Sequence, residues 1–304
     1  MRVLILGGTG LTGPFVVRRL HEQGHEVIVY HRGQHVIELP NAVRRYRGDF
    51  LNFPRELREP APEVVVHMWA DTEAAARAFL GAFRGAAGRA VVISSGDVYR
   101  AYGRLRRKES GPPDPPPLTE GAPLRDSRYP YDTDYDKILV EQTLTNQTDL
   151  PVTLLRFPAV YGPNDGHRLK RWIEPMLRGA PELRLQDDFG HWRWTHGYCE
   201  DVAEAVVLAA TRPEAAGQVY NVGELETPTM SERFAAYGRV AGWKGRLSLV
   251  PAAELPEADR WPLDFAHHLI YDTTRIRSEL GYAERVPLEE ATARTVEWER
   301  SLLQ

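Results

Sequence analysis

The sequence predicts an α/β protein built on a doubly wound parallel sheet, with a smaller part toward the C-terminal end. Three observations lead to this prediction. Short apolar segments alternate with helical patterns through the first half of the chain. A glycine-rich turn, LGGTGLTG at 6–13, follows the first of these segments at once. After about residue 157 the alternation loosens.

Seven segments are expected to be strands, and most of them are apolar throughout: 2–6, 26–30, 43–49, 63–68, 89–95, 151–157 and 218–223. Seven others have helical spacing or composition: 11–23, 72–87, 129–141, 166–179, 200–210, 231–242 and 287–303. Apolar strands that alternate with helices indicate a parallel sheet covered on both faces. Right-handed crossovers between the strands then give a Rossmann-like fold.

The domain organisation follows from the same pattern. Residues 1–160 are predicted to form a dinucleotide-binding domain, and 161–304 a substrate-binding part interleaved with it, since about 200–223 should return to the first domain. The proline-rich segment at 111–124 leaves no room for regular structure. Because it follows the fifth strand, it either borders the site or is a surface excursion.

Composition excludes several classes of function. Of 304 residues, 42% are hydrophobic and 26% charged, and the net charge is −4, so the basic excess of a nucleic-acid-binding protein is missing. The short basic run at 104–108 is expected to be a solvated loop. With Cys199 as the one cysteine, no intrachain disulfide can form, and the scattered histidines give no metal-ligand spacing.

The location expected from the sequence is the cytoplasm. The apolar run before the first glycines is too short for a signal peptide. No stretch approaches the roughly 20 apolar residues of a membrane span. We therefore expect a small-molecule substrate as the partner, and neither nucleic acid nor membrane.

The glycine-rich turn indicates a nucleotide site. Gly7 permits the tight turn, Gly10 lets the backbone approach phosphate, and Gly13 lets the following helix pack close to the sheet. Amide groups and the dipole at that helix N-terminus favour a pyrophosphate. The strand–turn–helix context so early in the chain favours this reading over a purely structural glycine turn.

The end of the second expected strand bears on the choice of dinucleotide. A ribose with free hydroxyls is met there by a carboxylate, and a 2′-phosphate by arginine. Residues 27–35 contain no acid, but they contain His31, Arg32 and His35. Arg32 either makes a two-pronged contact with phosphate or points to solvent. We expect NADP, with NAD as the alternative.

The chain resembles the extended short-chain dehydrogenase/reductase superfamily, in its NAD-dependent epimerase/dehydratase branch. The resemblance covers nearly the whole chain, and the order of its motifs makes it specific. The motifs are GGTGLTG at 7–13, GDF at 48–50, VVISSGDVY at 91–99, DYDKILVEQ at 134–142, RFPAVYGPND at 156–165, EDVAEAV at 200–206, YNVG at 220–223 and LGYAERVPLEEATARTVEW at 280–298.

The resemblance implies a set of cofactor contacts. Asp49 would accept a hydrogen bond from the adenine amino group, and Lys137 would bind the nicotinamide ribose. The other expected contacts follow the glycine turn and the ends of the strands: Gly7, Thr9, Gly10, Leu11, Gly13, His31, Arg32, Phe50, Met68, Trp69, Ala70, Ser94, Phe157 and Val160.

Catalytic and substrate residues are implied as well. Ser95 matches the family's catalytic Ser/Thr, and Lys137 the lysine that lowers the tyrosine pKa, with a surface salt bridge to Glu141 as the alternative role. Asp97 would touch substrate or supply a proton. His196 would contact substrate, act as an acid or simply pack. Further expected substrate contacts are Tyr161, Asn164 and Arg193.

The catalytic tyrosine is a departure from the family pattern. The family places it four residues before the lysine, where this chain has Thr133. On a helix, residues four apart lie about 40° apart around the axis and residues two apart about 200°, so Tyr135 should face away from Lys137. Tyr131 could reach the site only if the first turn is not helical, with Asp132 or Thr133 as N-cap. A threonine hydroxyl is a much poorer acid than a phenol.

Two functions stay open at this point. The first is an NAD(P)-dependent oxidoreductase or epimerase that acts on a hydroxyl or carbonyl carbon, for example of a nucleotide-sugar. Thr133 would hold the slot of the catalytic tyrosine, and the acid would be Tyr131, Asp97 or another group. The second is a catalytically impaired dinucleotide-binding protein that serves as a redox sensor or a partner-binding subunit. The resemblance also allows for a homodimer, because relatives commonly pair through the helix that carries the lysine.

Overall fold

The computed structural model describes residues 1–35, 37–129, 133–165 and 168–303. Its centre is a seven-stranded parallel sheet in the order β10-β6-β5-β4-β1-β2-β3. The strands are β1 (Arg2–Leu6), β2 (Glu26–His31), β3 (Arg44–Arg47), β4 (Val64–His67), β5 (Arg89–Ser95), β6 (Val152–Phe157) and β10 (Val219–Asn221). The strand order reverses between β1 and β4, and the doubly wound fold class expected from the sequence is confirmed.

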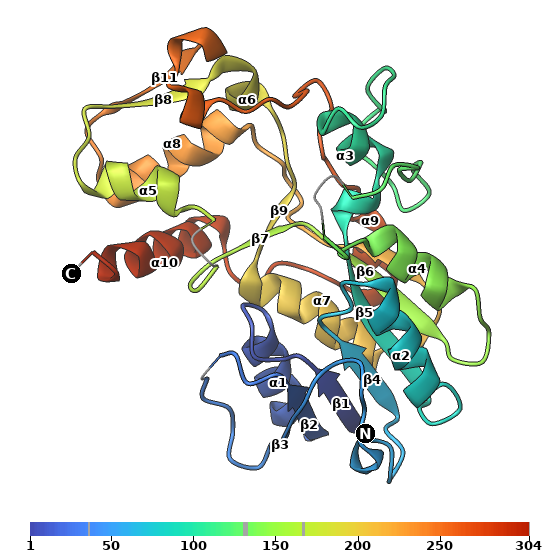
Figure 1. The fold of residues 1–304 in the computed structure, drawn as a ribbon. Coiled ribbons are helices and arrows are strands. Elements are labelled where there is room, and N and C mark those ends of the chain that lie inside the picture. The colour runs from blue at the N-terminus through green and yellow to red at the C-terminus, as the bar shows by residue number, and fades with distance from the viewer. Residues whose placement is uncertain (36, 130–132, 166–167, 304) are drawn as a thin grey trace.

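Helices cover both faces of this sheet (Figure 1). On one face lie α1 (Gly13–Glu22), α7 (Cys199–Thr211) and α9 (Thr274–Leu280), and on the other α2 (Glu73–Phe83) and α4 (Lys137–Thr145). Successive residues of a strand point to opposite faces. Val3 and Ile5 accordingly pack with α1 and α7, whereas Leu4 and Leu6 pack with α2. Since both faces are buried, the central strands are apolar throughout.

The remaining elements form a second cluster above the carboxyl ends of the strands (Figure 1). It contains α5 (Lys170–Leu177), α6 (Asp187–His191), α8 (Met230–Ala241), α10 (Leu288–Ser301) and a two-stranded parallel sheet of β8 (Glu182–Gln186) and β11 (Arg246–Val250). Beneath it, β7 (Ala159–Tyr161) pairs in parallel with β9 (His196–Tyr198). The short helix α3 (Arg100–Leu105) opens the proline-rich excursion.

The chain passes between the two clusters more than once. After β9 it returns to the main sheet, where β10 pairs with the outer edge of β6 from Val219 opposite Leu154 to Asn221 opposite Arg156. The division into 1–160 and 161–304 stays a prediction.

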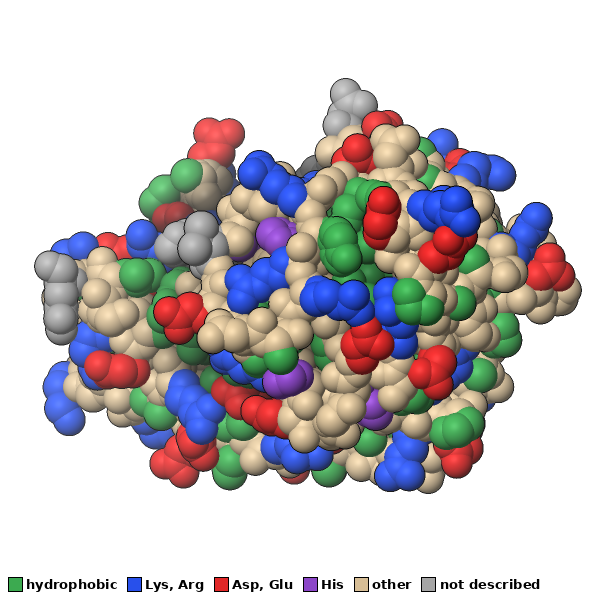
Figure 2. Space-filling model, turned by 90° about the horizontal axis from the view of Figure 1, so that it is seen from below, with side chains coloured by type: hydrophobic (Ala, Val, Ile, Leu, Met, Phe, Trp, Pro, Cys, Tyr) green, Lys and Arg blue, Asp and Glu red, His purple; other side chains and the backbone are tan. Residues whose placement is uncertain are grey.

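Charges of both signs are mixed over the surface seen in Figure 2, and no broad field of one sign appears on that face. Among the described residues, no helix has both the length and the apolar character that a membrane crossing needs. The same residues contain no group of three or more side chains arranged to hold a metal ion.

Candidate active site and dinucleotide groove

A groove opens where β1 turns into α1. Gly7 and Gly8 have φ angles of +107° and +76°, which side-chain-bearing residues rarely adopt. A Cβ atom on Gly13 would lie 2.4 Å from the backbone of Gly8, so only glycine lets the helix start this close to the turn. Gly10, by contrast, faces open space. The turn therefore leaves room, beside a helix N-terminus, for a phosphate.

Most of the expected cofactor contacts line this groove: Gly7, Thr9, Gly10, Leu11, Gly13, His31, Arg32, Phe50, Met68, Trp69, Phe157 and Val160. Sequence reasoning missed four further lining residues, Gly8, Thr12, Gln34 and Ile93. The guanidinium carbon of Arg32 lies 4.8 Å from the Trp69 ring centroid and 5.5 Å from that of Phe50. Two histidines, His31 and His35, line the groove together with Arg32. The groove thus has the glycine cradle and the apolar wall that a dinucleotide needs.

Four expected cofactor contacts are not among the lining residues. The Asp49 carboxylate accepts hydrogen bonds from the backbone amides of Leu51 and Asn52, both at 2.8 Å, and so closes a local turn. Ser94 points to the opposite face of β5 from Ser95 and donates to Glu141. Ala70 is fully buried, and its carbonyl oxygen accepts a hydrogen bond from Lys137. Lys137 is the fourth.

Lys137 lies behind the groove wall with all three of its N–H donors engaged. Its Nζ donates to Asp71 Oδ1 at 2.7 Å, to Ala70 O at 2.9 Å and to Ile93 O at 3.1 Å. A surface salt bridge with Glu141 is wrong for this lysine, because Lys137 is 4% exposed and Glu141 pairs instead with the buried Arg156. Asp71, which the sequence reasoning overlooked, balances the ammonium charge.

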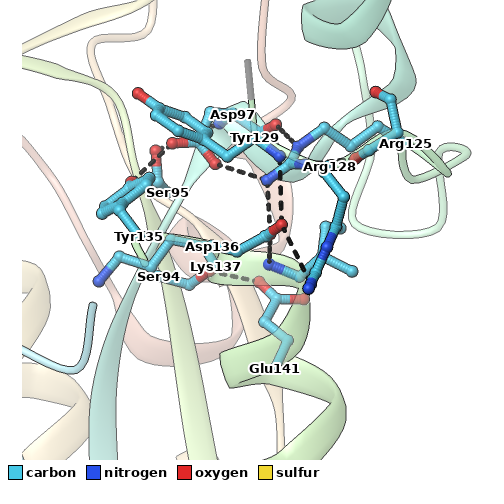
Figure 3. Close-up of polar contacts among 12 residues, drawn as sticks. Ser94, Ser95, Asp97, Arg125, Arg128, Tyr129, Tyr135, Asp136, Lys137 and Glu141 are labelled. Carbon is cyan, nitrogen blue, oxygen red and sulfur yellow. Dashed lines mark hydrogen bonds and ion pairs between the residues drawn. The ribbon is translucent and has the colours of Figure 1, made fainter. Parts of the chain in front are cut away.

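The tyrosine beside Lys137 is Tyr135, contrary to the expectation from helix geometry. That expectation assumed a helix through residue 135, but α4 begins at Lys137, with Asp136 as its N-cap. Tyr135 therefore sits in non-helical backbone and turns back toward β5. Its hydroxyl donates to Asp97 Oδ2 at 2.6 Å, and its ring centroid lies 5.7 Å from Lys137 Nζ (Figure 3).

Thr133 was expected in the slot of the catalytic tyrosine, and Tyr131 was a candidate for a displaced acid. Thr133 is exposed, and its Oγ1 accepts a hydrogen bond from the Tyr135 backbone amide at 3.2 Å. It faces solvent, so the geometry contradicts its placement in the catalytic slot. Tyr131 lies outside the described residues.

Ser95, Asp97 and Tyr135 form a compact polar centre at the carboxyl end of β5 (Figure 3). Ser95 Oγ accepts a hydrogen bond from the Asp97 amide at 3.2 Å. Burial raises the pKa of Asp97, although Tyr135 and Arg125 partly offset it. Burial and the Asp97 carboxylate raise the pKa of Tyr135, while the Ser95 hydroxyl acts in the opposite sense. Tyr135 consequently holds its proton and Asp97 takes one more readily than a solvated aspartate.

The other expected substrate residues lie apart from this centre. Tyr161 and His196 are buried, and His196 Nδ1 lies 2.7 Å from the Trp194 carbonyl oxygen. Burial, and then the charge of Arg233, hold the pKa of His196 well below its usual value, so it is a neutral packed residue. Asn164 is exposed in a turn with φ +69°.

Arg193, the last of the expected substrate residues, is half-buried and donates to the Thr227 carbonyl oxygen at 2.7 Å. This bond ties the segment before β9 to the segment that precedes α8, so the side chain is already engaged within the protein.

Comparison with known proteins assigns the family. The NAD dependent epimerase/dehydratase family matches residues 3–223. The 2'-dehydrokanamycin reductase of Streptomyces kanamyceticus is 30% identical over 230 residues, which cover 70% of this chain and 59% of that protein. The 2-alkyl-3-oxoalkanoate reductase of Stenotrophomonas maltophilia is 29% identical over 258 residues, 76% of this chain and 73% of that protein. An uncharacterized protein of Sinorhizobium fredii is 26% identical, with 58% of each chain covered. The chain thus spans less than two thirds of the length of two of these relatives.

Solved structures share the fold over the whole chain. A UDP-glucose 4-epimerase from Stenotrophomonas maltophilia, solved with NAD, has a TM-score of 0.78 at 23% identity and covers 100% of this chain and 99% of its own. A UDP-glucose 4-epimerase from Thermotoga maritima, solved with UDP-glucose, has a TM-score of 0.74 at 23% identity with both chains fully covered. The resemblance to the NAD-dependent epimerase/dehydratase family that the motifs indicate is confirmed. The chain belongs to the NAD-dependent epimerase/dehydratase family.

Proposed function

We propose that this chain is an NADP(H)-dependent oxidoreductase that interconverts a carbonyl and a hydroxyl group on a polar small molecule. The observation that carries the proposal is the placement of Tyr135, whose hydroxyl meets Asp97 beside Ser95 at the end of β5, next to the dinucleotide groove. The catalytically impaired alternative rested on the absence of a tyrosine four residues before Lys137. The Tyr135 hydroxyl beside Asp97 removes that reason. Two curated relatives named as reductases support reduction over epimerisation.

The nicotinamide ring, when bound, supplies or accepts the hydride. The protein's part is to hold and protonate the substrate oxygen. Ser95 donates a hydrogen bond to that oxygen, and Tyr135 delivers a proton to it during reduction. Asp97 contacts the tyrosine hydroxyl from the other side, so it can return a proton to the tyrosine once it is itself protonated. In the oxidising direction the same proton travels the opposite way.

The preference for NADP rests on the basic end of the groove. Arg32 stands over Trp69 and Phe50, with His31 and His35 beside it, at the place where a 2′-phosphate would lie. A guanidinium can bind such a phosphate with two parallel hydrogen bonds. Lys137 and Asp49 stay proposed cofactor contacts, which requires Lys137 to exchange Asp71 for a ribose hydroxyl.

The assembly and location that we propose are a homodimer in the cytoplasm. The pairing surface would be the groove between α2 and α4, which charged and amide side chains line, including Glu73, Arg77 and Gln142. Light scattering should then give twice the 34.4 kDa chain mass. A monomer at high micromolar concentration would remove the assembly proposal and leave the activity proposal standing.

The experiment is a turnover assay with NADPH and a panel of ketones, aldehydes and oxo-sugars, followed by absorbance of the reduced cofactor. Tyr135→Phe should lower kcat by about 10² to 10⁴, the usual worth of a positioned acid. Tyr46→Phe, the same change on β3, is the matched control and should stay within about twofold. Tight NADPH binding without turnover on any panel member would instead support the redox-sensor or partner-binding alternative.

A further inference from the structure

Arg125 lies at the end of the proline-rich segment, and its guanidinium is completely enclosed, with 0% of the side chain exposed. Its donors reach three separate parts of the chain. Nε donates to the Asp97 carbonyl oxygen at 2.8 Å, Nη1 to the Ser127 carbonyl oxygen at 2.6 Å, and Nη2 to Asp136 Oδ1 at 2.7 Å (Figure 3). The Arg125 guanidinium thus joins the turn after β5 to Asp136, the N-cap of α4.

Asp136 stands between Tyr135 and Lys137 and has two further roles. Its Oδ1 accepts a hydrogen bond from the Ile138 amide at 3.1 Å, which makes it the N-cap of α4, and its Oδ2 accepts one from the Tyr129 amide at 3.2 Å. Because Tyr135 precedes the helix, helical hydrogen bonds do not hold its backbone in place. The Tyr135 amide donates to Thr133 Oγ1 and the Asp136 amide to the Asp71 carbonyl oxygen, and the pairing of Asp136 with Arg125 adds a buried ionic contact that holds the same backbone.

The same arginine also fixes the other half of the centre. The Tyr135–Asp97 hydrogen bond spans the start of α4 and the turn after β5, and Arg125 bridges these two segments in parallel with it. We propose that Arg125 is a positioning residue that sets the Tyr135 hydroxyl against Asp97 and Ser95. This inference rests on the proposed function of that centre. It accounts for a tyrosine that works from two residues before the lysine instead of four.

Arg156 and Glu141 form the natural comparison. Arg156 is 4% exposed and binds Glu141 on the same helix through two hydrogen bonds, at 3.0 and 2.8 Å. That pair anchors α4 to β6 one turn beyond Lys137. The other hydrogen bonds of Arg156 go to the Tyr99 hydroxyl and the Glu120 carbonyl oxygen, away from Tyr135 and Asp97. If the buried arginines that bind carboxylates of the α4 segment matter only for folding, variants of Arg125 and Arg156 should behave alike. If Arg125 positions the acid, their kinetics should differ.

The test compares Arg125→Ala, Arg125→Lys and Arg156→Lys in the full chain. We expect Arg125→Ala to lower kcat by about 10², to leave the calorimetric Kd for NADPH within about threefold, and to regain turnover when guanidinium ions are added. Arg125→Lys should recover only part of the loss, because an ammonium cannot span three acceptors as a planar fork does. Arg156→Lys should lower the melting temperature while kcat, per folded molecule, changes about threefold or less, with no response to guanidinium.

Equal kcat losses in the Arg125 and Arg156 variants, or no recovery with guanidinium, would overturn the inference. A second measurement is independent of turnover. A crystal structure of the Arg125→Ala chain should show the Tyr135 hydroxyl displaced from Asp97 Oδ2, and a bond that persists at 2.6 Å would refute the positioning role. If the wild type shows no turnover at all, the proposed function fails, and this structural readout still decides whether Arg125 places the tyrosine.

Discussion

Lys137 and Asp71 form an ion pair, 2.7 Å from Nζ to Oδ1, in which the lysine is nearly buried and the aspartate is partly open to solvent. With two carbonyl oxygens as its other partners, the lysine has no N–H group left for a cofactor hydroxyl. A dinucleotide that recruits Lys137 has to break this ion pair first, so Asp71 competes with the cofactor.

Asp71→Asn should therefore tighten dinucleotide binding. Removing the carboxylate charge weakens the competing contact by roughly 0.5–1 kcal/mol, the usual worth of a partly exposed pair. The Kd for NADPH, measured by calorimetry, should fall about twofold to fivefold. Asp134→Asn, at an exposed position near the same segment, is the control and should leave the Kd unchanged. A weaker Kd in Asp71→Asn would mean that the carboxylate itself binds the cofactor.

Thr133→Tyr should not create or increase reductase activity. The position is exposed and lies four residues before the first residue of α4, in non-helical backbone, so a phenol there points to solvent instead of toward Lys137. We expect kcat within about threefold of the wild type, and the double variant Thr133→Tyr/Tyr135→Phe to be as slow as Tyr135→Phe alone. Activity restored in the double variant would show that residue 133 can occupy the catalytic slot.

Arg32→Ala should change the preference between cofactors. Loss of a two-pronged phosphate contact should reduce kcat/KM for NADPH about tenfold to a hundredfold, while kcat/KM for NADH stays within about threefold. Arg44→Ala is the control, since that arginine lies on β3 and pairs with Glu26 away from the groove. Equal losses of kcat/KM with both cofactors would mean that Arg32 contacts the adenine or only packs against Trp69 and Phe50. The argument for NADP would then be lost.

His67 should make the protein less stable as the solution becomes acidic. It is fully buried at the end of β4, and burial, followed by the charge of Lys137, lowers its pKa to about 3. Below the ordinary value of 6.5 the unfolded chain takes up a proton that the folded chain does not. Stability therefore falls as pH drops below 6.5, by about 1.4 kcal/mol per pH unit from this one group.

The non-titrating variant His67→Asn should flatten this dependence. The asparagine side-chain oxygen can accept the hydrogen bond that the Trp69 backbone amide donates to the imidazole Nδ1 in the wild type. Between pH 6.5 and 5, urea unfolding should show the wild type losing about 2 kcal/mol more than the variant. His35→Asn, at an exposed position, should keep the wild-type slope. Parallel curves for the wild type and His67→Asn would contradict a neutral buried imidazole.

The strands of the main sheet were predictable because apolar runs of five to seven residues have few alternatives: β1 and β5 begin and end where expected, and β10 is shorter by three residues. The helix before the RFPAVYGP segment was predicted to begin too early. Asp132, Thr133 and Asp136 are all good N-cap residues, so a local rule cannot choose among them. The choice falls on Asp136 because Arg125, eleven residues earlier, binds its carboxylate.

Two other features could not be predicted from the sequence for the same reason, because they depend on contacts between residues that are distant in the chain. The sheet of β8 and β11 joins segments some sixty residues apart, and neither has a strong pattern of its own. Asp71 was overlooked because its partner Lys137 is distant in sequence and only the fold places the two side by side. The glycine turn, in contrast, is local, and most of its lining residues, Gly7, Thr9, Gly10, Leu11 and Gly13, could be predicted from the sequence, although Gly8 and Thr12 were missed.

The late return of β10 to the sheet has a consequence for synthesis on the ribosome. When β6 emerges, its outer edge carries unpaired backbone groups, and the strand that covers them follows only about sixty residues later. During that interval the growing chain exposes the unpaired N–H and C=O groups of an edge strand. Such an edge can form hydrogen bonds with a strand of another molecule and so promote aggregation. A nascent chain that is halted after β7 should therefore aggregate or bind chaperones, whereas a chain that has completed β10 should not.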